Sequence, residues 1–125
     1  MKIEMKDKSV NIDGVEYVEA GTVSTPAQSL DGMPYVVIRS RDAGCHAGYL
    51  KKDNETSVEL VKSRRLWYWS GAASLSQLAM EGVSKPGDCK FACEVDEIKI
   101  INHCEIIKAT EAARKSIQGV SEWKR

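Results

Sequence analysis

The chain has 125 residues, of which 42% are hydrophobic and 29% are charged. These values are typical of a single folded domain and argue against a disordered protein. Eighteen Lys and Arg balance eighteen Asp and Glu, so the net charge is zero. Proteins that coat long nucleic acids or bind membrane surfaces draw affinity from an excess of positive charge, and we therefore expect neither partner.

The beginning of the chain carries no recognisable targeting signal. Met1–Lys6 lacks the apolar core of a signal peptide, and no apolar run approaches the roughly 20 residues of a membrane-spanning helix. We therefore expect a cytoplasmic protein whose four cysteines are reduced thiols.

Residues 1–20 predict an N-terminal β-hairpin arm. Hydrophobic and polar residues alternate on both sides of Asp13-Gly14, which is a strong two-residue turn signal. Residues 21–33 have the composition of a linker, with small residues, one proline and no periodicity. Because an isolated hairpin is marginal in water, we expect the arm to pack on the main domain or on a second subunit, which favours a homo-oligomer.

The main domain is predicted to span residues 34–125 and to begin with β-strands. Runs of β-favouring residues predict strands at 35–39, 49–52, 57–61 and 64–69. Gly44 and Gly48 bracket Cys45 and His46. Glycine within a strand marks either a bulge or bend, which is the commoner case, or a close approach of the backbone to a ligand.

Two short helices and three further strands are predicted in the second half. Ser74 and Gln77 fit a capping box at the start of one helix, and Gly82 suits its end. Thr110 caps a second helix over residues 111–118. Strands are expected at 90–93, 98–101 and 104–107, with Asn102-His103 as the turn that joins the last two into a pair. The fold class we predict is α+β: a small, curved, mostly antiparallel sheet with two short helices and the N-terminal hairpin arm.

The segment from Arg64 to Trp69 combines two arginines with three aromatic residues. A strand period of two sorts its side chains onto two faces: Arg65, Trp67 and Trp69 on one, and Arg64, Leu66 and Tyr68 on the other. A guanidinium beside two indoles suits a phosphate next to a stacked base. Tryptophans in a small sheet are, however, more often part of the core, and an arginine stacked on an indole is an ordinary cation–π pair.

Metal binding and catalysis find weaker support in the sequence. Cys89, Cys93, His103 and Cys104 are soft ligands, but adjacent residues on a strand point to opposite faces, so this spacing suits a zinc site poorly. Cys45 beside His46 does not form a catalytic dyad for the same reason, and no phosphate-binding loop or dinucleotide motif is present. We expect no metal, no cofactor and no enzymatic activity.

The aromatic segment and its continuation resemble a known family. The residues that carry the likeness are Arg64-Arg65-Leu66-Trp67-Tyr68-Trp69-Ser70-Gly71-Ala72 and Ser74-Leu75-Ser76-Gln77-Leu78-Ala79, within a match over residues 34–124. They are similar to a family of small uncharacterised proteins from bacteriophages and prophages. The resemblance implies a phage-encoded protein that acts in the host cytoplasm, or a minor virion component, and it assigns no activity.

From these residues we predict a phage accessory protein that binds a nucleotide-type ligand without catalysis. One version of this prediction is a role against host defence, in which the protein sequesters a host signal. A pocket with two or three arginines suffices for such a ligand and needs no net positive charge. The alternative is a structural or interaction protein, either a virion component or an inhibitor of a host protein, whose aromatic segment is core. The predicted ligand-binding residues are Arg39, Arg41, His46, Arg64, Arg65, Trp67, Tyr68 and Trp69.

Overall fold

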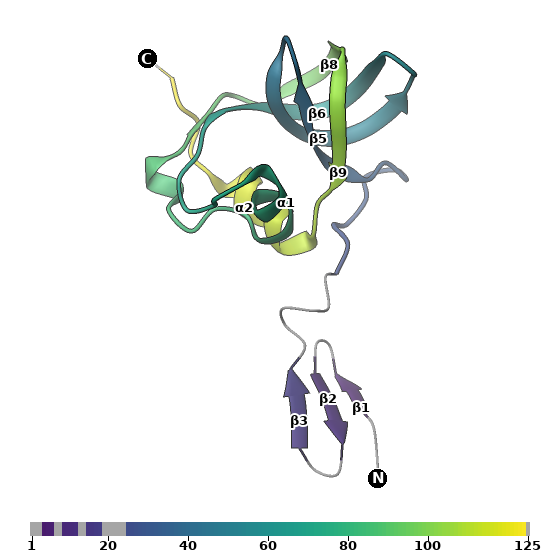
Figure 1. Ribbon diagram of the computed structural model, residues 1–125, viewed down its shortest axis with the longest axis vertical. Helices are drawn as coiled ribbons and strands as arrows, with labels where there is room; N and C mark the ends of the chain where they lie inside the picture. Colours follow the sequence, from purple (N-terminus) through teal and green to yellow (C-terminus); the bar gives the residue numbers. More distant parts are fainter. Residues whose placement is uncertain (1–3, 7–8, 13–14, 19–24, 125) are drawn as a thin grey trace.

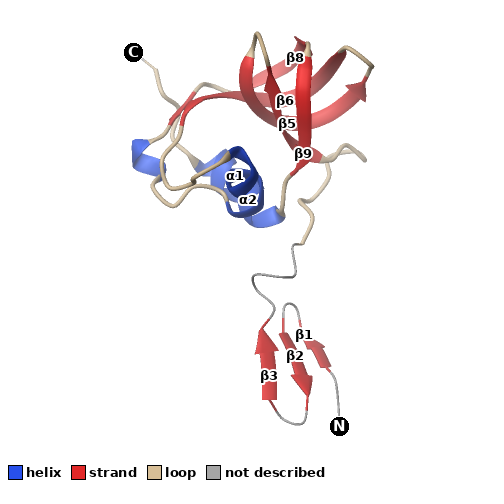
Figure 2. Ribbon diagram, in the orientation of Figure 1, coloured by secondary structure: helices blue, strands red, loops and turns tan. Residues whose placement is uncertain are grey.

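The computed structural model describes residues 4–6, 9–12, 15–18 and 25–124. In the main part of the chain, a curved antiparallel sheet is covered on one face by two helices (Figures 1 and 2). This arrangement confirms the predicted α+β class. Within the described residues, neither helix is long and apolar enough to cross a membrane.

The N-terminal strands form a sheet of their own. β1 (Glu4–Lys6), β2 (Ser9–Ile12) and β3 (Val15–Val18) pair in that order, all antiparallel. The predicted hairpin corresponds to β2 and β3, and β1 adds a third strand. The predicted turn at Asp13-Gly14 lies outside the described residues.

The second half of the predicted linker contacts the main domain. Residues 21–24 lie outside the described part, whereas the N–H of Ala27 donates to Ala109 O (3.1 Å) and that of Glu111 donates to Thr25 O (2.8 Å). Ala27, Leu30 and Met33 also pack against buried core residues. The segment has an irregular backbone, and its sequence therefore shows no periodicity. Composition alone does not distinguish such a packed segment from a free linker.

Six strands form the main sheet. Its order is β7-β6-β5-β4-β9, and β8 also pairs with β6. The bounds are β4 Tyr35–Ser40, β5 Gly44–Asp53, β6 Ser57–Tyr68, β7 Lys90–Phe91, β8 Val95–Ile101 and β9 His103–Lys108. β6 is long enough to hold both β8 and β7 along one edge, with Ser57 opposite Ile101 and Leu66 opposite Phe91.

The predicted pairing of the last two strands is wrong. β8 pairs with β6 and β9 pairs with β4, and none of the strand pairs in the described residues joins β8 to β9. The connecting residue Asn102 is held instead by the turns of other strands: its N–H donates to Thr56 O (2.8 Å), and its carbonyl accepts from Arg41 N (3.3 Å). These bonds hold the connection through which the chain passes from β8, paired with β6, to β9, paired with β4.

The bulge predicted at the glycines of β5 is present. The register between β5 and β6 shifts between Ala47 and Tyr49, on either side of Gly48. A Cβ atom on Gly48 would lie 2.9 Å from Ser63 Cα, closer than real side chains come. Glycine is therefore required where the two backbones approach each other.

Both helices begin at the predicted caps. α1 spans Leu75–Glu81, and Ser74 Oγ accepts from Gln77 N at 3.1 Å. α2 spans Glu111–Gly119, and Thr110 Oγ1 accepts from Ala113 N at 3.1 Å. A short 3₁₀ helix over Pro86–Asp88, which we did not predict, lies between α1 and β7.

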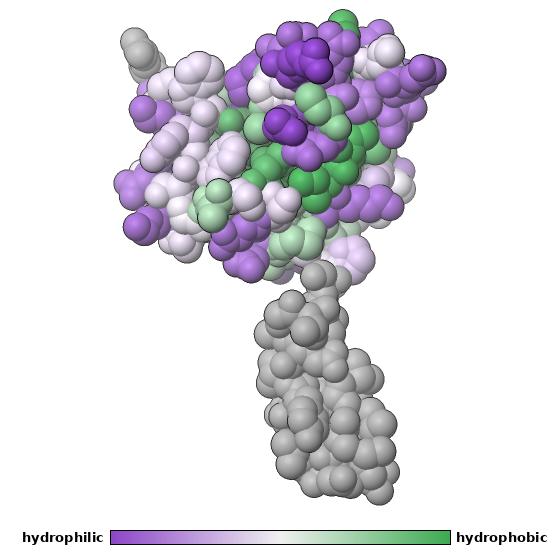
Figure 3. Space-filling view, viewed as in Figure 1, coloured by the Kyte–Doolittle hydropathy of each residue, from purple (hydrophilic) through white to green (hydrophobic). Residues whose placement is uncertain are grey.

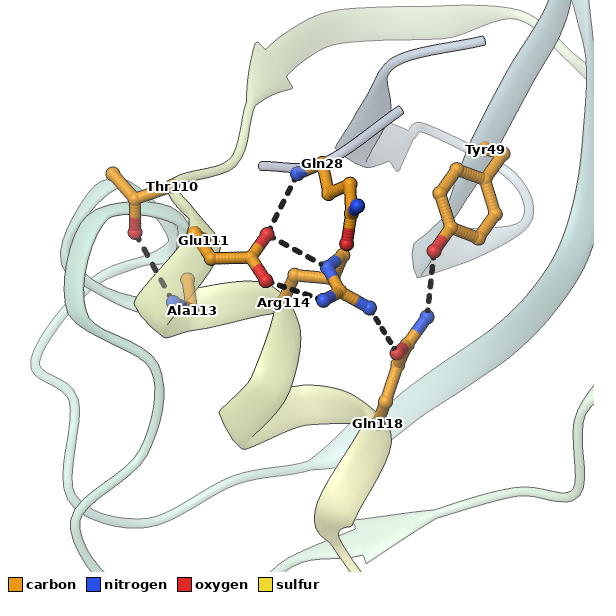
Figure 4. Close-up of polar contacts among 7 residues, drawn as sticks. All are labelled: Gln28, Tyr49, Thr110, Glu111, Ala113, Arg114 and Gln118. Atoms are coloured by element: carbon orange, nitrogen blue, oxygen red, sulfur yellow. Dashed lines mark hydrogen bonds and ion pairs between the residues drawn. The ribbon is translucent and has the colours of Figure 1, made fainter. Parts of the chain in front are cut away.

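A polar network fixes α2 to the sheet and to the preceding segment (Figure 4). Glu111 forms an ion pair with Arg114 and accepts from the Gln28 N–H at 2.6 Å. Arg114 Nη1 donates to Gln118 Oε1 (2.7 Å), and Gln118 Nε2 donates to the Tyr49 hydroxyl (3.2 Å) on β5. The helix is thus held by hydrogen bonds to β5 and to the segment before β4.

The curved sheet has a core on each face. The larger core lies between the sheet and the helices and contains residues such as Tyr35, Phe91, Leu78 and Ile117. The smaller core lies on the other face and consists of Val36, Ile38, Val58, Leu60 and Ile100. In the space-filling view, hydrophobic atoms gather near the position of β9, surrounded by hydrophilic ones (Figure 3).

Candidate functional site

The candidate site is a cleft where β5 and β6 diverge. The last residue pair between these strands is His46 with Arg65, but β6 continues for three more residues to Tyr68. A cleft of about 370 Å³ lies between the start of β5 and this extension. It is lined by Asp42, Ala43, Gly44 and Cys45 on one side and by Arg65, Leu66, Trp67 and Trp69 on the other.

Three predicted site residues, Arg65, Trp67 and Trp69, therefore meet in this cleft. The Trp67 side chain is 65% exposed, whereas Trp69 is half-buried and packs against the larger core. Arg65 is exposed, and its Nη1 donates to Ala43 O at 2.6 Å. That bond uses one of the five N–H donors of the guanidinium. The exposed indole of Trp67 thus lies in the same cleft as the Arg65 guanidinium, which has further N–H donors available for a ligand.

Trp67 also stacks on the C-terminal tail. Its ring lies 6.5 Å from that of Trp123, centroid to centroid, with the two planes 10° apart. The tail runs beside β7, because Glu122 bridges to Phe91 and the Trp123 N–H donates to Phe91 O at 2.8 Å (Figure 1). The last tryptophan of the chain is therefore held next to the aromatic segment.

A second cleft is lined by Trp123, the other ring of this stacked pair, and not by Trp67. It has a volume of about 460 Å³ and is lined by Tyr68, Ser70, Gly87, Asp88, Cys89, Lys90 and Trp123. Tyr68 is 52% exposed, and the Lys90 ammonium lies 5.5 Å from the centre of the Trp123 ring. Tyr68 thus belongs to this second cleft and does not line the first.

Arg64 has a structural role that excludes it from the site. Its side chain is buried, with 6% of the residue exposed, and it donates to the carbonyls of Ala92 (2.9 Å), Ile117 (2.8 Å), Val120 (2.7 Å) and Phe91 (3.2 Å). Burial lowers the pKa of the guanidinium, which still stays charged at any ordinary pH. Arg64 joins β6 to the end of α2 and to the residues of β7.

His46 lies behind the cleft and does not line it. The residue is buried, and its Nε2 lies 2.8 Å from Ala43 O, the carbonyl that also accepts from Arg65. Because a carbonyl only accepts, we assign the proton to Nε2. Burial lowers the pKa of the imidazole, which is therefore neutral near pH 7. His46 Nδ1 and Ser63 Oγ have no hydrogen-bond partner within the described part of the chain, and both residues line a small cavity of about 110 Å³.

The other two predicted arginines lie outside the cleft lining. Arg39 donates from Nε to Glu105 Oε1 at 2.9 Å, across the pair of β4 and β9. Arg41 lies in the turn between β4 and β5, where its backbone N–H bonds to Asn102. Neither side chain lines the cleft beside Arg65 and Trp67.

Sequence reasoning missed several residues of the two clefts. The Ala43 carbonyl carries no side-chain signal that could have been found. Trp123 and Lys90 are 56 and 23 residues from Trp67 in sequence. The pairing of β7 with β6 brings Lys90 near, and the pairing of the tail with β7 brings Trp123 near. Cys45 also lines the first cleft; burial raises the pKa of its thiol, which makes it a poor nucleophile.

The four cysteines are unpaired. Within the described residues, no three His, Cys, Asp or Glu side chains are grouped in a way that could hold a metal ion.

Comparison with known proteins gives one match. A family model described as a domain of unknown function (DUF6948) matches residues 33–117, which include the six strands of the main sheet, α1, all but the last two residues of α2, and the first cleft. No curated protein and no solved structure matches the chain. The match begins one residue before the predicted start of the main domain at residue 34.

Proposed function

The chain belongs to the DUF6948 family of domains of unknown function, and from its own residues we propose that it binds a nucleotide-type ligand, without catalysis, in the cleft between β5 and β6. In this proposal the Trp67 indole stacks on the base and the Arg65 guanidinium pairs with a phosphate. Trp69 and the Ala43–Cys45 backbone form the walls.

One observation carries the proposal: the exposed indole of Trp67 lines the same cleft as the exposed guanidinium of Arg65. A tryptophan that served only the core would be buried, because transfer of such a large ring from water is a main source of stability. A stacked base contributes about 1–3 kcal/mol, and a hydrogen bond to a charged group about 1.5–3 kcal/mol. Both contacts are available at this one site.

The size and charge of the cleft support a small ligand. Its volume of about 370 Å³ lies at the lower end of the range of roughly 300–1,000 Å³ that is usual for ligand pockets. Asp42 also lines the cleft, and its Oδ2 accepts from Asn102 Nδ2 at 2.9 Å. One cation and one carboxylate suit a ligand with few phosphates. We propose that such binding sequesters a signal of a bacterial host, which is the setting that the resemblance to phage proteins implies.

Tryptophan fluorescence, titrated with a panel of mono-, di- and cyclic nucleotides, tests the proposal. We expect saturable quenching and a loss of at least tenfold in affinity in Arg65→Met, because 1.4 kcal/mol corresponds to a factor of ten. Arg39→Met is the matched control: it removes an exposed arginine outside the cleft and should leave the affinity unchanged. A flat response across the panel, or equal losses in both variants, would contradict nucleotide binding.

A second candidate function is docking of another protein chain, which can be a second copy of this one. It is favoured by the exposure of Trp67, Tyr68 (52%) and Trp123 (38%) around the stacked pair, since exposed aromatics are enriched at protein interfaces. Light scattering across a concentration series would detect self-association through this surface. A Trp67→Ser variant that lowers the measured mass without any effect of nucleotides on wild type would favour this candidate.

A further inference from the structure

We infer that the ligand carries two planar bases joined by a short anionic linker, so that one base enters each of the two clefts beside the Trp67–Trp123 stack. This inference rests on the proposed function, because it keeps Arg65 and Trp67 as the first binding site. It adds a second site made by Trp123, Tyr68 and Lys90.

The stacked pair contributes one ring to each of two clefts of similar size. The Trp67 and Trp123 rings are nearly parallel, with planes 10° apart, so their outer faces point in opposite directions. Trp67 lines the cleft of about 370 Å³, and Trp123 lines the one of about 460 Å³. Each volume falls within the range of roughly 300–1,000 Å³ for small-molecule sites. Each cleft can therefore take one base with its sugar.

Both clefts combine an aromatic surface with a cation. The first has Arg65 beside Trp67, and the second has Lys90 over the ring of Trp123, with Tyr68 as a further aromatic wall. Trp67 of the first cleft and Tyr68 of the second are adjacent on β6, and Trp123 stacks on Trp67. Aromatic side chains of the two clefts therefore lie next to one another, and proteins use such aromatics to hold successive bases.

The charges of the clefts limit the length of the ligand. Asp42 faces the first cleft together with Arg65, and Asp88 faces the second together with Lys90. The acidic Glu122 beside them pairs with Lys124 at 3.4 Å. Because the acidic side chains nearly balance the basic ones, the surface suits one or two phosphates and disfavours a long polyanion. A dinucleotide, linear or cyclic, meets this requirement.

The second site is held by backbone bonds. The tail that carries Trp123 is bridged to β7 and bonded through its own N–H to Phe91 O at 2.8 Å. Lys90 lies on β7, opposite Tyr68. Side chains positioned by paired strands lose less freedom on binding than those of a loose tail, so more of the contact energy appears as affinity.

Isothermal titration calorimetry of the full chain tests the inference with AMP, linear pApA, cyclic di-AMP and a longer oligo(dA) strand, and with the corresponding guanine ligands. We expect at least one dinucleotide to bind tenfold or more tightly than its mononucleotide. Lys90→Ala and Trp123→Ala should each reduce the ratio of dinucleotide to mononucleotide affinity. Lys99→Ala, an exposed lysine on β8 outside both clefts, is the matched control and should change neither affinity.

Each outcome has one meaning. Equal affinity for mono- and dinucleotides, or a dinucleotide advantage that survives in Lys90→Ala and Trp123→Ala, overturns the second site and leaves the proposed function intact. Tightest binding of the long strand overturns the limit of two bases. An absence of binding by every ligand overturns the proposed function and the second site together. Comparison of the linear with the cyclic ligand identifies which form the site takes.

Discussion

Replacement of the buried Arg64 by methionine should cost far more stability than the same replacement of its neighbour Arg65. Methionine fills a similar volume but cannot donate hydrogen bonds, so four backbone carbonyls lose the Arg64 donors. Phe91 O still accepts from Trp123 N, and Ile117 O from Val120 N.

The expected magnitude follows from the carbonyls that would have no donor left. Within the described residues, Ala92 O and Val120 O accept from Arg64 alone. An unsatisfied buried polar group costs about 1–3 kcal/mol, which gives roughly 2–6 kcal/mol for the two. A neighbouring cavity of about 220 Å³, lined by Arg64 and Val120, lets water satisfy part of this loss. We therefore expect Arg64→Met to reduce the free energy of unfolding by about 2–4 kcal/mol.

Urea unfolding at 25 °C, followed by far-UV circular dichroism, measures this difference. Arg65→Met should lose less than about 1 kcal/mol, because Ala43 O keeps the bond from His46 Nε2 after Arg65 is removed. The far-UV signal is preferable to fluorescence because two tryptophans lie next to Arg65. A loss below about 1 kcal/mol in Arg64→Met, or equal losses in both variants, would refute the structural role of Arg64.

Three further predictions concern titration and backbone strain. Burial places the folded pKa of His46 below its unfolded value of about 6.5, so the unfolded chain binds the proton first and stability falls as pH drops through that value. His46→Gln should remove this fall, which is at most about 1.4 kcal/mol per pH unit. Urea titrations from pH 7 to 5 measure the difference. Hydrogen bonds from Arg114 lower the pKa of Glu111 to about 2, so the ionised Glu111 stabilises the fold above pH 4.5 and this stabilisation is lost as pH falls towards 2. Glu111→Gln should flatten this part of the curve of stability against pH. An unchanged slope would argue against the ion pair. Gly82 has φ 79° and an added Cβ would meet a side chain of α2 at 2.4 Å, so Gly82→Ala should lower the thermal midpoint, whereas Gly119→Ala, with no atom within 4 Å of its added Cβ, should not.

The elements with local signals could be predicted from the sequence. Ser74 and Thr110 cap their helices as expected, because a cap needs only residues three positions apart. The central strand at Tyr35 and the bulge at Gly48 also follow from residue type. The partners of β8 and β9 could not be predicted in the same way. Their pairing depends on contacts of Asn102 with turns that lie about 46 to 61 residues earlier in the chain.

The candidate site could be predicted only in part. A period of two correctly places Arg64 and Leu66 on a buried side and Arg65 and Trp67 on an exposed one. The rule fails from Tyr68 onwards, where β6 ends. Tyr68 is 52% exposed although it was predicted to share a face with the buried Arg64 and Leu66, and Trp69 turns towards the core. The role of Arg64 was also out of reach, since its four acceptors lie 27 to 56 residues away in sequence.

The carbonyl of Ala43 has a consequence for how readily the cleft can respond to an anion. It accepts at the same time from the buried imidazole of His46 and from the exposed guanidinium of Arg65. When an incoming phosphate draws the guanidinium away, the carbonyl still has the imidazole as donor, so no orphaned acceptor opposes the exchange. The hydrogen bond to Ala43 O therefore orients Arg65 before the anion binds, yet the loss of this bond costs little free energy. The guanidinium is thus preoriented for the anion and can leave Ala43 O at a small cost in free energy.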